Sequence, residues 1–219
     1  VSGSTITFAS NLVTGDVINF IQILGNVLDL GVPSDSTVSI AKLTATGTKN
    51  STTFLRGDNT FNAPPLGGIT SASQFRLTTS FDGDATPIAS NLAEVNTDGY
   101  GRIGTAVSES SGIFTFPSTG VWLIIFMVGA SEDGTVNYHT GCIDTTVNNS
   151  SYSSASCCDQ NWSSSGAAYS SAECSFIFDV TNTTTHKVRF TIDSAGTSTT
   201  EGSGAAVATG MTFIRLGDT

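Results

Sequence analysis

The alternation of apolar and polar residues predicts β-strands through most of the second half of the chain. Residues 187–192 read Lys-Val-Arg-Phe-Thr-Ile, which is the period of two that a strand with one buried face shows. The pattern predicts that Val188, Phe190 and Ile192 are buried. Eight strands are expected in all, separated by turns rich in Gly or Ser, over residues 74–79, 100–107, 112–116, 121–128, 138–147, 173–180, 187–192 and 209–216.

The most apolar stretch is GIFTFPSTGVWLIIFMV, residues 112–128. Because strand side chains alternate, Phe114 and Phe116 share one face of a first strand, and a Pro-Ser-Thr-Gly turn follows it. Residues 121–128 are then all apolar, too few to cross a membrane as a helix, and rich in β-branched and aromatic side chains. They predict a strand covered on both faces, the second face being covered by the same chain or by a partner subunit.

This stretch resembles the globular head of the complement and tumour-necrosis-factor superfamily, through Phe114, Phe116, Pro117, Gly120, Trp122 and the apolar run 123–128. The alternating segment 211–216 resembles the family's last strand, which packs near a three-fold axis. The resemblance covers residues 70–219 and implies an all-β jelly-roll sandwich that assembles as a homotrimer. The residues expected in the core and the trimer seam are Phe114, Phe116, Trp122, Ile124, Phe126, Met211, Phe213 and Leu216.

The first 69 residues have a different character. Short alternating segments with turns at Gly15-Asp16 and Gly25-Asn26 predict a small β-module over residues 1–31. Residues 32–69 contain Thr- and Ser-rich runs, Pro64-Pro65 and Gly67-Gly68, and predict an extended neck. Three short strands are marginal alone, so this part needs neighbouring copies or similar modules upstream.

The segments GSTITFASNLVTGDVINFIQI, PSDSTVSIAKLTATGT and STTFLRGDNTF follow one another in this part. Together they resemble the distal part of tail fibres of tailed bacteriophages, over residues 3–62, with Asn59 where Gly is commoner and Phe61 where Trp is commoner. A neck of this kind suggests that Arg56 pairs with an acid of an adjacent chain and that Gly57 permits a tight turn.

The fibre resemblance implies an extracellular, virion-borne receptor-binding protein. It would attach the virion to a bacterial surface glycan or protein and would have the other tail or fibre proteins as partners. The alternative is a purely structural virion protein, either a capsid decoration or a fibre trimerisation module. The chain begins with Val1 rather than Met, so we expect it to be a fragment or a processed product.

The low content of charged residues and the negative net charge limit the kinds of molecule that this chain can bind. Charged residues make up 12% of the chain, about half the usual share, while 30 Ser and 33 Thr take their place and favour strands and turns. The net charge of −10 disfavours nucleic acid and anionic membranes as partners. No membrane-inserting segment is expected.

Four cysteines, Cys142, Cys157, Cys158 and Cys174, fall within one part of the expected head. Their even number in a Ser-rich segment favours disulfides, and because adjacent cysteines rarely bond, Cys157 and Cys158 should each bond to Cys142 or Cys174. Free half-buried thiols are the alternative reading. Zinc is disfavoured, since no Cys-x-x-Cys spacing is present.

Residues 148–171 form the longest polar segment and mix aromatic residues with Ser, Asn and Gln. Such a mixture is typical of binding loops and suits a sugar, although a solvated surface loop would have the same composition. The candidate receptor-binding residues are Tyr138, His139, Asn148, Asn149, Tyr152, Gln160, Asn161, Trp162 and Tyr169.

Catalysis is not expected. The chain has two histidines among many serines and no Gly-x-Ser-x-Gly motif. The acidic turns Asp82-Gly83-Asp84 and Glu132-Asp133-Gly134 offer oxygen ligands for calcium, but neither opens a loop with calcium-binding spacing, and solvated acidic turns are the preferred reading. No cofactor and no metal site are predicted.

Overall fold

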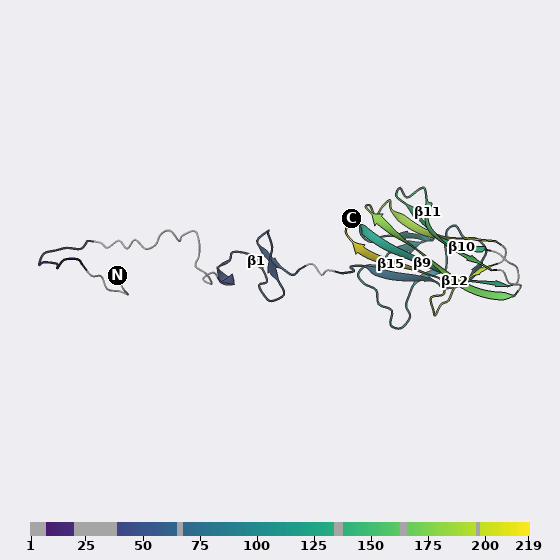
Figure 1. The fold of residues 1–219 in the computed structure, drawn as a ribbon, viewed down its shortest axis with the longest axis horizontal. Helices are drawn as coiled ribbons and strands as arrows, with labels where there is room; N and C mark the ends of the chain where they lie inside the picture. Colours follow the sequence, from purple (N-terminus) through teal and green to yellow (C-terminus); the bar gives the residue numbers. More distant parts are fainter. Residues whose placement is uncertain (1–7, 20–38, 65–67, 134–137, 163–165, 196–197) are drawn as a thin grey trace. The chain divides into compact units, whose positions relative to one another are not determined.

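The computed structural model of the chain describes residues 8–19, 39–64, 68–133, 138–162, 166–195 and 198–219. Its contacts divide the chain into two units, Val1–Leu66 and Gly67–Thr219, which are described separately below (Figure 1). The second unit, here called the head, begins three residues before the boundary expected from the sequence.

In the first unit, residues 8–19 contain bends and a turn but no strand. The predicted β-module over residues 1–31 is therefore not formed in its described part, and residues 1–7 and 20–31 lie outside the described residues. A strand needs a partner strand for its backbone hydrogen bonds, and residues 8–19 have none within the described chain.

The predicted neck contains a small sheet rather than only extended chain. A 3-10 turn, η2 (Ile40–Lys42), precedes three short strands. They are β1 (Thr46–Gly47), β2 (Phe54–Leu55) and β3 (Thr60–Asn62), with β3 in the centre, parallel to β1 and antiparallel to β2. Phe54 and Leu55 remain 44% exposed, so three strands alone do not bury their apolar side chains.

The turn between β2 and β3 holds the residues expected to shape the neck. Arg56 lies 3.9 Å from Asp58 of the same turn, and its pairing with an adjacent chain stays a prediction. The left-handed backbone is at Asn59, with φ 60°, and not at Gly57. Asparagine and glycine both tolerate this conformation, which explains why Asn can stand at a position where Gly is commoner. Asp58 accepts hydrogen bonds from the Thr60 hydroxyl and amide, which lower the pKa of its carboxyl.

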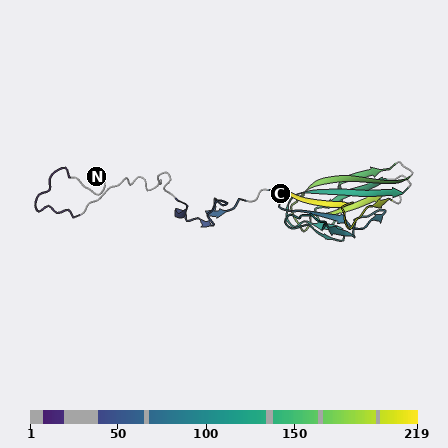
Figure 2. The same ribbon diagram turned by 90° about the horizontal axis from the view of Figure 1, so that it is seen from below.

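The head consists of two sheets of long strands that run along a common direction (Figure 2). Six strands of the seven-stranded sheet follow the order β5-β14-β9-β15-β4-β6. The seventh strand, β12, pairs with β9 along the edge that the other strands leave free. Its strands are β4 (Ala72–Leu77), β5 (Phe81–Asp82), β6 (Leu92–Glu94), β9 (Gly120–Asp133), β12 (Ala167–Val180), β14 (Thr199–Thr200) and β15 (Gly210–Gly217).

The five-stranded sheet has the order β11-β10-β13-β8-β7. Its strands are β7 (Ser108–Ser110), β8 (Ile113–Thr115), β10 (Tyr138–Thr146), β11 (Ser153–Asn161) and β13 (Lys187–Ser194). The prediction of an all-β jelly-roll sandwich is confirmed for the head.

The core lies between the two sheets and is rich in phenylalanine. The ring of Phe114 on β8 lies 5.2 Å from Phe75, 5.3 Å from Phe190 and 5.1 Å from Phe213, measured between centroids. Such pairs add to the stabilisation that their burial alone provides. Val188, Phe190 and Ile192 are buried, as the alternation on β13 predicted.

The apolar run on β9 divides cleanly between two faces. The even-numbered residues Trp122, Ile124, Phe126 and Val128 are fully buried between the sheets. The odd-numbered residues of the same run point outward and are only half-buried. Within the described residues the chain covers one face of β9, and the covering of its second face by a partner subunit stays a prediction.

Two segments of the head differ from the expectation. Residues 100–107 do not form a strand; they contain only an isolated bridge between Ile103 and Ala72. Conversely, the polar segment 148–171 is not one loop, because it contains β11 and the start of β12. The β11 sequence SSASCCDQN has almost no apolar alternation, and its pairing with β10 is what makes it a strand.

Candidate functional site

The β10–β11 hairpin places the candidate receptor-binding residues at two separate ends of the head. Tyr138 pairs with Asn161 at one end, and Asn148, Asn149 and Tyr152 lie in or beside the turn at the other. Eight residues of strand separate the ends, which is roughly 26 Å at about 3.3 Å per residue. The nine candidates therefore do not form one site.

Three of the nine candidates lie inside the protein. Trp162 is only 7% exposed and packs against His139, with 6.2 Å between the ring centroids. Gln160 is also buried and donates a hydrogen bond from its side-chain nitrogen to the carbonyl of Val128 at 3.3 Å. Trp162, His139 and Gln160 cannot contact a receptor from these positions, which corrects the expectation that they do.

The His139 environment also bears on catalysis. Its Nδ1 lies 2.9 Å from Ser198 Oγ and its Nε2 lies 3.1 Å from Thr200 Oγ1. All three residues have no exposed surface, so a substrate cannot reach either hydroxyl. Burial lowers the pKa of the His139 imidazole, because the charged form loses its hydration. This trio is a neutral, hydrogen-bonded part of the core.

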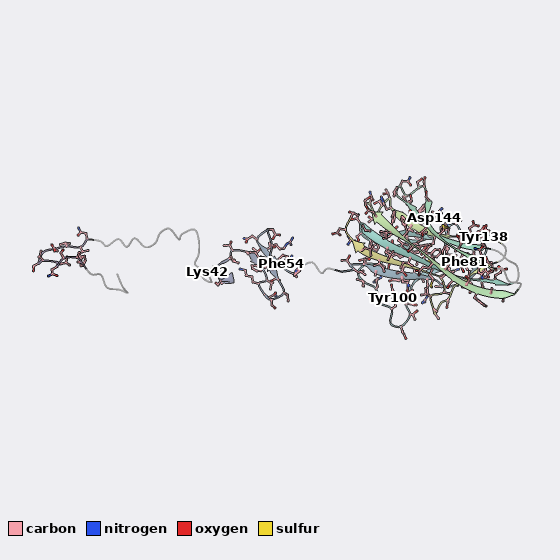
Figure 3. The ribbon with its side chains drawn as sticks, viewed as in Figure 1. Lys42, Phe54, Phe81, Tyr100, Tyr138 and Asp144 are labelled. Carbon is pink, nitrogen blue, oxygen red and sulfur yellow. A yellow bond between two sulfur atoms is a disulfide. The ribbon has the colours of Figure 1, made fainter. Side chains whose placement is uncertain are left out.

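Tyr138 lies at the end of the head opposite the point where the chain enters it. Its hydroxyl donates to Asp193 Oδ1 at 3.2 Å, and this carboxylate raises the pKa of the phenol. The amide of Ala195 donates to the Tyr138 carbonyl at 3.0 Å, and that of Ser194 donates to Asp84 Oδ1 at 2.8 Å. Tyr138, Asp193 and Asp84 therefore form one exposed surface, here called the distal surface, and Figure 3 shows Tyr138 toward this end with Phe81.

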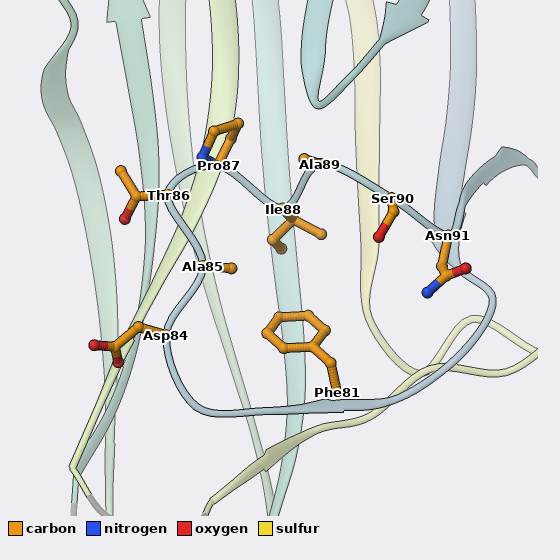
Figure 4. A pocket seen from close by; sticks show the side chains of 9 residues that line it. All are labelled: Phe81, Asp84, Ala85, Thr86, Pro87, Ile88, Ala89, Ser90 and Asn91. Carbon is orange, nitrogen blue, oxygen red and sulfur yellow. The ribbon is translucent and has the colours of Figure 1, made fainter.

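Next to the distal surface is a pocket of about 400 Å³ formed by residues 81–91. The Phe81 ring lies inside the loop below Ala85 and Ile88, and the Asp84 carboxylate points away from the ring (Figure 4). Backbone hydrogen bonds of 2.9 Å from Ala85 to Ile192 and from Ile88 to Phe190 fasten the loop to β13. The pocket therefore combines an aromatic ring with polar groups on a loop that is hydrogen-bonded to β13.

At the other end of the hairpin the polar residues stabilise their own turn. Asn148 Oδ1 accepts hydrogen bonds from the amides of Ser150 and Ser151 at 3.0 and 2.9 Å. The Arg189 guanidinium lies 4.4 Å from the centre of the Tyr152 ring and forms a 3.1 Å ion pair with Asp144. These contacts give Asn148 and Tyr152 structural roles, while Asn149 is exposed with φ 54°.

The last candidate, Tyr169, is 81% exposed and belongs to another surface. Its strand β12 pairs with β9, and Tyr169 lies opposite Ser131 on the outward side of the seven-stranded sheet. On that side, half-buried or exposed apolar residues of β9, β12 and β15 lie next to one another. We call this surface the outer apolar face; its residues are Val121, Leu123, Ile125, Met127, Ile177 and Ile214.

The register of the sheet joins apolar residues of three strands at Leu123, while Val121 and Met127 lie opposite Asp179 and Glu173 of β12. Leu123 is opposite Ile177 on β12 and Ile214 on β15, and Ile177 is 60% exposed. A hollow of about 260 Å³ adjoins Ile214 and is also lined by Gln74 and Tyr100. The outer apolar face is therefore centred on Leu123, Ile177 and Ile214 and is bordered by acidic residues of β12.

The residues predicted for the core and the trimer seam lie mainly inside one chain. All of them except Leu216 are at most 2% exposed between the two sheets, and Leu216 is 48% exposed. Because side chains alternate along a strand, the residues available to another copy are the intervening ones of the outer apolar face. The uninterrupted apolar run of β9 indicated a second covered face, but the list of seam residues did not name the outward side chains that form it.

The four cysteines divide into two pairs. Cys142 and Cys157 lie opposite each other on β10 and β11 and form a disulfide. Cys158 and Cys174 are free buried thiols, which differs from the expectation that Cys157 and Cys158 both form disulfides. Adjacent residues of a strand point to opposite faces, so Cys157 faces outward while Cys158 faces the core.

The acidic turns show no metal site in the part of the chain that is described. Asp82 Oδ1 accepts a 2.5 Å hydrogen bond from the Thr199 hydroxyl, and Glu132 is buried. No group of three or more His, Cys, Asp or Glu residues is placed to hold a metal ion in the described ranges. Within these same ranges no helix has the length and apolar character needed to cross a membrane.

Comparison with known proteins identifies the fold. No protein-family model matches this chain, and neither does any curated protein sequence. The crystal structure of murine APRIL at pH 5.0 matches with a TM-score of 0.50 and 14% identity, over 67% of this chain and 98% of that one. The structure of Eiger TNF from S. frugiperda has a TM-score of 0.49 and 12% identity, over 68% of this chain and 93% of that one. The head of this protein is a jelly roll of the tumour-necrosis-factor type.

Proposed function

We propose that this chain is the distal part of a trimeric phage tail fibre and that its head binds a molecule on the bacterial surface. The observation that carries the proposal is the order of the chain: three fibre-like segments within residues 3–62 are followed directly by a jelly-roll head. The likeness to APRIL supports the fold alone, because one fold serves many functions. The fibre-like segments favour a fibre tip over a soluble signalling ligand.

The outer apolar face supports assembly into a trimer. A head that functioned as a single copy would leave Leu123, Ile125 and Ile177 partly exposed to water. Packing this face against two further copies would remove that area from water, at about 25 cal/mol for each Å² buried. The exposed Phe54 and Leu55 of the first unit have the same need for neighbouring copies.

The distal surface and its pocket are the place proposed for the receptor. Tyr138, Asp193, Asp84 and the Phe81 pocket lie at the end of the head away from the entering chain. An aromatic ring in a pocket next to a polar surface with tyrosine and aspartate side chains suits a glycan, whose C–H face packs on a ring while its hydroxyls hydrogen-bond. Three such sites on one tip would bind by avidity even if each were weak. We infer no enzymatic activity, no cofactor, and no nucleic-acid or membrane partner.

Binding of the fluorescent-labelled full chain to a panel of bacterial strains, measured by flow cytometry, tests this proposal. We expect binding to at least one strain. The Tyr138→Ala/Asp193→Ala double variant should remain trimeric and lose binding at least tenfold, while Asn149→Ala at the opposite end should bind as the wild type does. If the double variant binds normally, the receptor site is elsewhere on the head. Absence of binding to any strain, including hosts that the virion infects, would favour the purely structural alternative.

A further inference from the structure

The free thiols of Cys158 and Cys174 lie together between the two sheets of the head. Cys158 Sγ is 3.5 Å from the Gly141 carbonyl oxygen, and Cys174 Sγ is 3.7 Å from the same oxygen. Each residue is 7% exposed. Because both sulfurs lie within 3.7 Å of one oxygen atom, the two thiols are close neighbours in the core.

The strands that carry these thiols lie at the same open edge of the sandwich. Cys158 is on β11, which pairs only with β10 among the described strands, and Cys174 is on β12, which pairs only with β9. The two strands belong to different sheets. A covalent bond between them would join the sheets at an edge where no backbone ladder does so.

We propose that Cys158 and Cys174 are a redox-sensitive pair that forms a second disulfide, joining β11 to β12, when a disulfide oxidant such as oxidised glutathione is present. This inference concerns the head alone and holds whether or not the proposed function is correct. It also gives the adjacent residues Cys157 and Cys158 separate partners, Cys142 and Cys174.

The reaction is two successive thiol–disulfide exchanges. The Cys158 thiolate attacks one sulfur of the oxidant, which gives a mixed disulfide and releases one thiolate of the oxidant. Cys174 loses its proton and attacks the Cys158 sulfur, which forms the Cys158–Cys174 bond and releases the second thiolate. Two protons from the cysteines end on the two released thiols, so two electrons pass from the pair to the oxidant.

The surroundings assign the first step to Cys158. The neighbouring Cys174 thiol lowers the pKa of the Cys158 thiol, while the Cys158 thiol and burial raise the pKa of Cys174. Because both sulfurs are buried, the oxidant must reach them during folding or when the β11–β12 edge opens locally. In the finished fold we therefore expect oxidation over minutes to hours rather than at once.

Intact mass spectrometry of the full chain provides the test. The protein is incubated with oxidised glutathione, then denatured and alkylated with iodoacetamide without reductant. With both disulfides formed, no cysteine is alkylated and the chain carries no adduct. If only Cys142–Cys157 forms, the chain carries two adducts, one on Cys158 and one on Cys174, and the proposal fails.

Two double variants fix the connectivity. In Cys142→Ser/Cys157→Ser only the proposed pair remains, and we expect no adduct after oxidation. Closing a loop of this length should raise the melting temperature by about 6–12 °C relative to the reduced form of the same variant. The matched control, Cys158→Ser/Cys174→Ser, retains the Cys142–Cys157 bond and should show no change assignable to a second bond. Two iodoacetamide adducts on the Cys142→Ser/Cys157→Ser variant after oxidation would overturn the proposal. If that variant does not fold, the number of adducts on the wild-type chain decides whether the second disulfide forms.

Discussion

Replacing Leu123 by Asp should separate the assembly of the head from its folding. Leu123 lies at the centre of the outer apolar face, between Ile177 and Ile214, and is half-buried in one chain. Its neighbours Trp122 and Ile124 point the other way, into the core. A carboxylate at position 123 therefore enters the proposed interface between copies and leaves the packing between the sheets intact.

The expected loss of assembly is large. Full burial of a leucine side chain is worth about 1.5–3 kcal/mol, and at most about a third of the Leu123 surface remains to be buried, so the interface gains about 0.5–1 kcal/mol per copy from it. Leaving a carboxylate dehydrated and unpaired costs about 2 kcal/mol or more per copy. The three copies together lose about 8 kcal/mol, which lowers the trimer association constant by a factor of about 10⁵ to 10⁶ at 1.4 kcal/mol for each factor of ten.

Sedimentation velocity at micromolar concentration measures this effect, and circular dichroism checks that the strands remain. Val147→Asp is the matched control, because Val147 is 61% exposed at the end of β10, away from the outer apolar face. We expect single copies for Leu123→Asp and an unchanged trimer for Val147→Asp. A Leu123→Asp protein that sediments as the wild-type trimer would refute the assignment of this face to the interface.

Three further changes test the head itself. Gly141→Ala places a Cβ 2.5 Å from Val128 Cγ2 and should lower the free energy of unfolding by about 1–3 kcal/mol in urea titrations, whereas Gly101→Ala, which meets nothing within 4 Å, should not. Phe114→Ala removes the most central ring of the core and should cost about 3–5 kcal/mol; a cost below 1 kcal/mol would contradict the described packing. Because burial lowers the pKa of His139 below its unfolded value of about 6.5, the unfolded chain binds more protons in acid, so stability should fall as the pH drops below 6.5. His139→Gln should weaken this dependence between pH 7.5 and 5, and an equal dependence in both proteins would show that His139 is not its source.

The sequence predicts the jelly roll well because the core strands alternate. On β13 the buried residues Val188, Phe190 and Ile192 follow from a period of two. The run on β9 is harder to interpret, because every residue is apolar and the pattern does not say which face meets the other sheet. A shift of one residue exchanges core and surface, and for this reason the predicted seam residues lie in the core.

The candidate site was predicted less well, for a different reason. β11 is a strand because it pairs with β10, and its Ser-rich sequence carries no such signal. Once β11 is a strand, Gln160 and Trp162 turn toward the core, and Tyr138 and Asn148 lie at opposite ends of a hairpin. Tertiary pairing decided these positions, and local composition could not reveal it.

Light scattering coupled to size exclusion measures the mass of the full chain in solution and decides whether three copies assemble. We expect a mass about three times the 22.5 kDa of one chain, independent of concentration over the micromolar range. A mass of one chain at every concentration would contradict it, since the outer apolar face would then remain in contact with water.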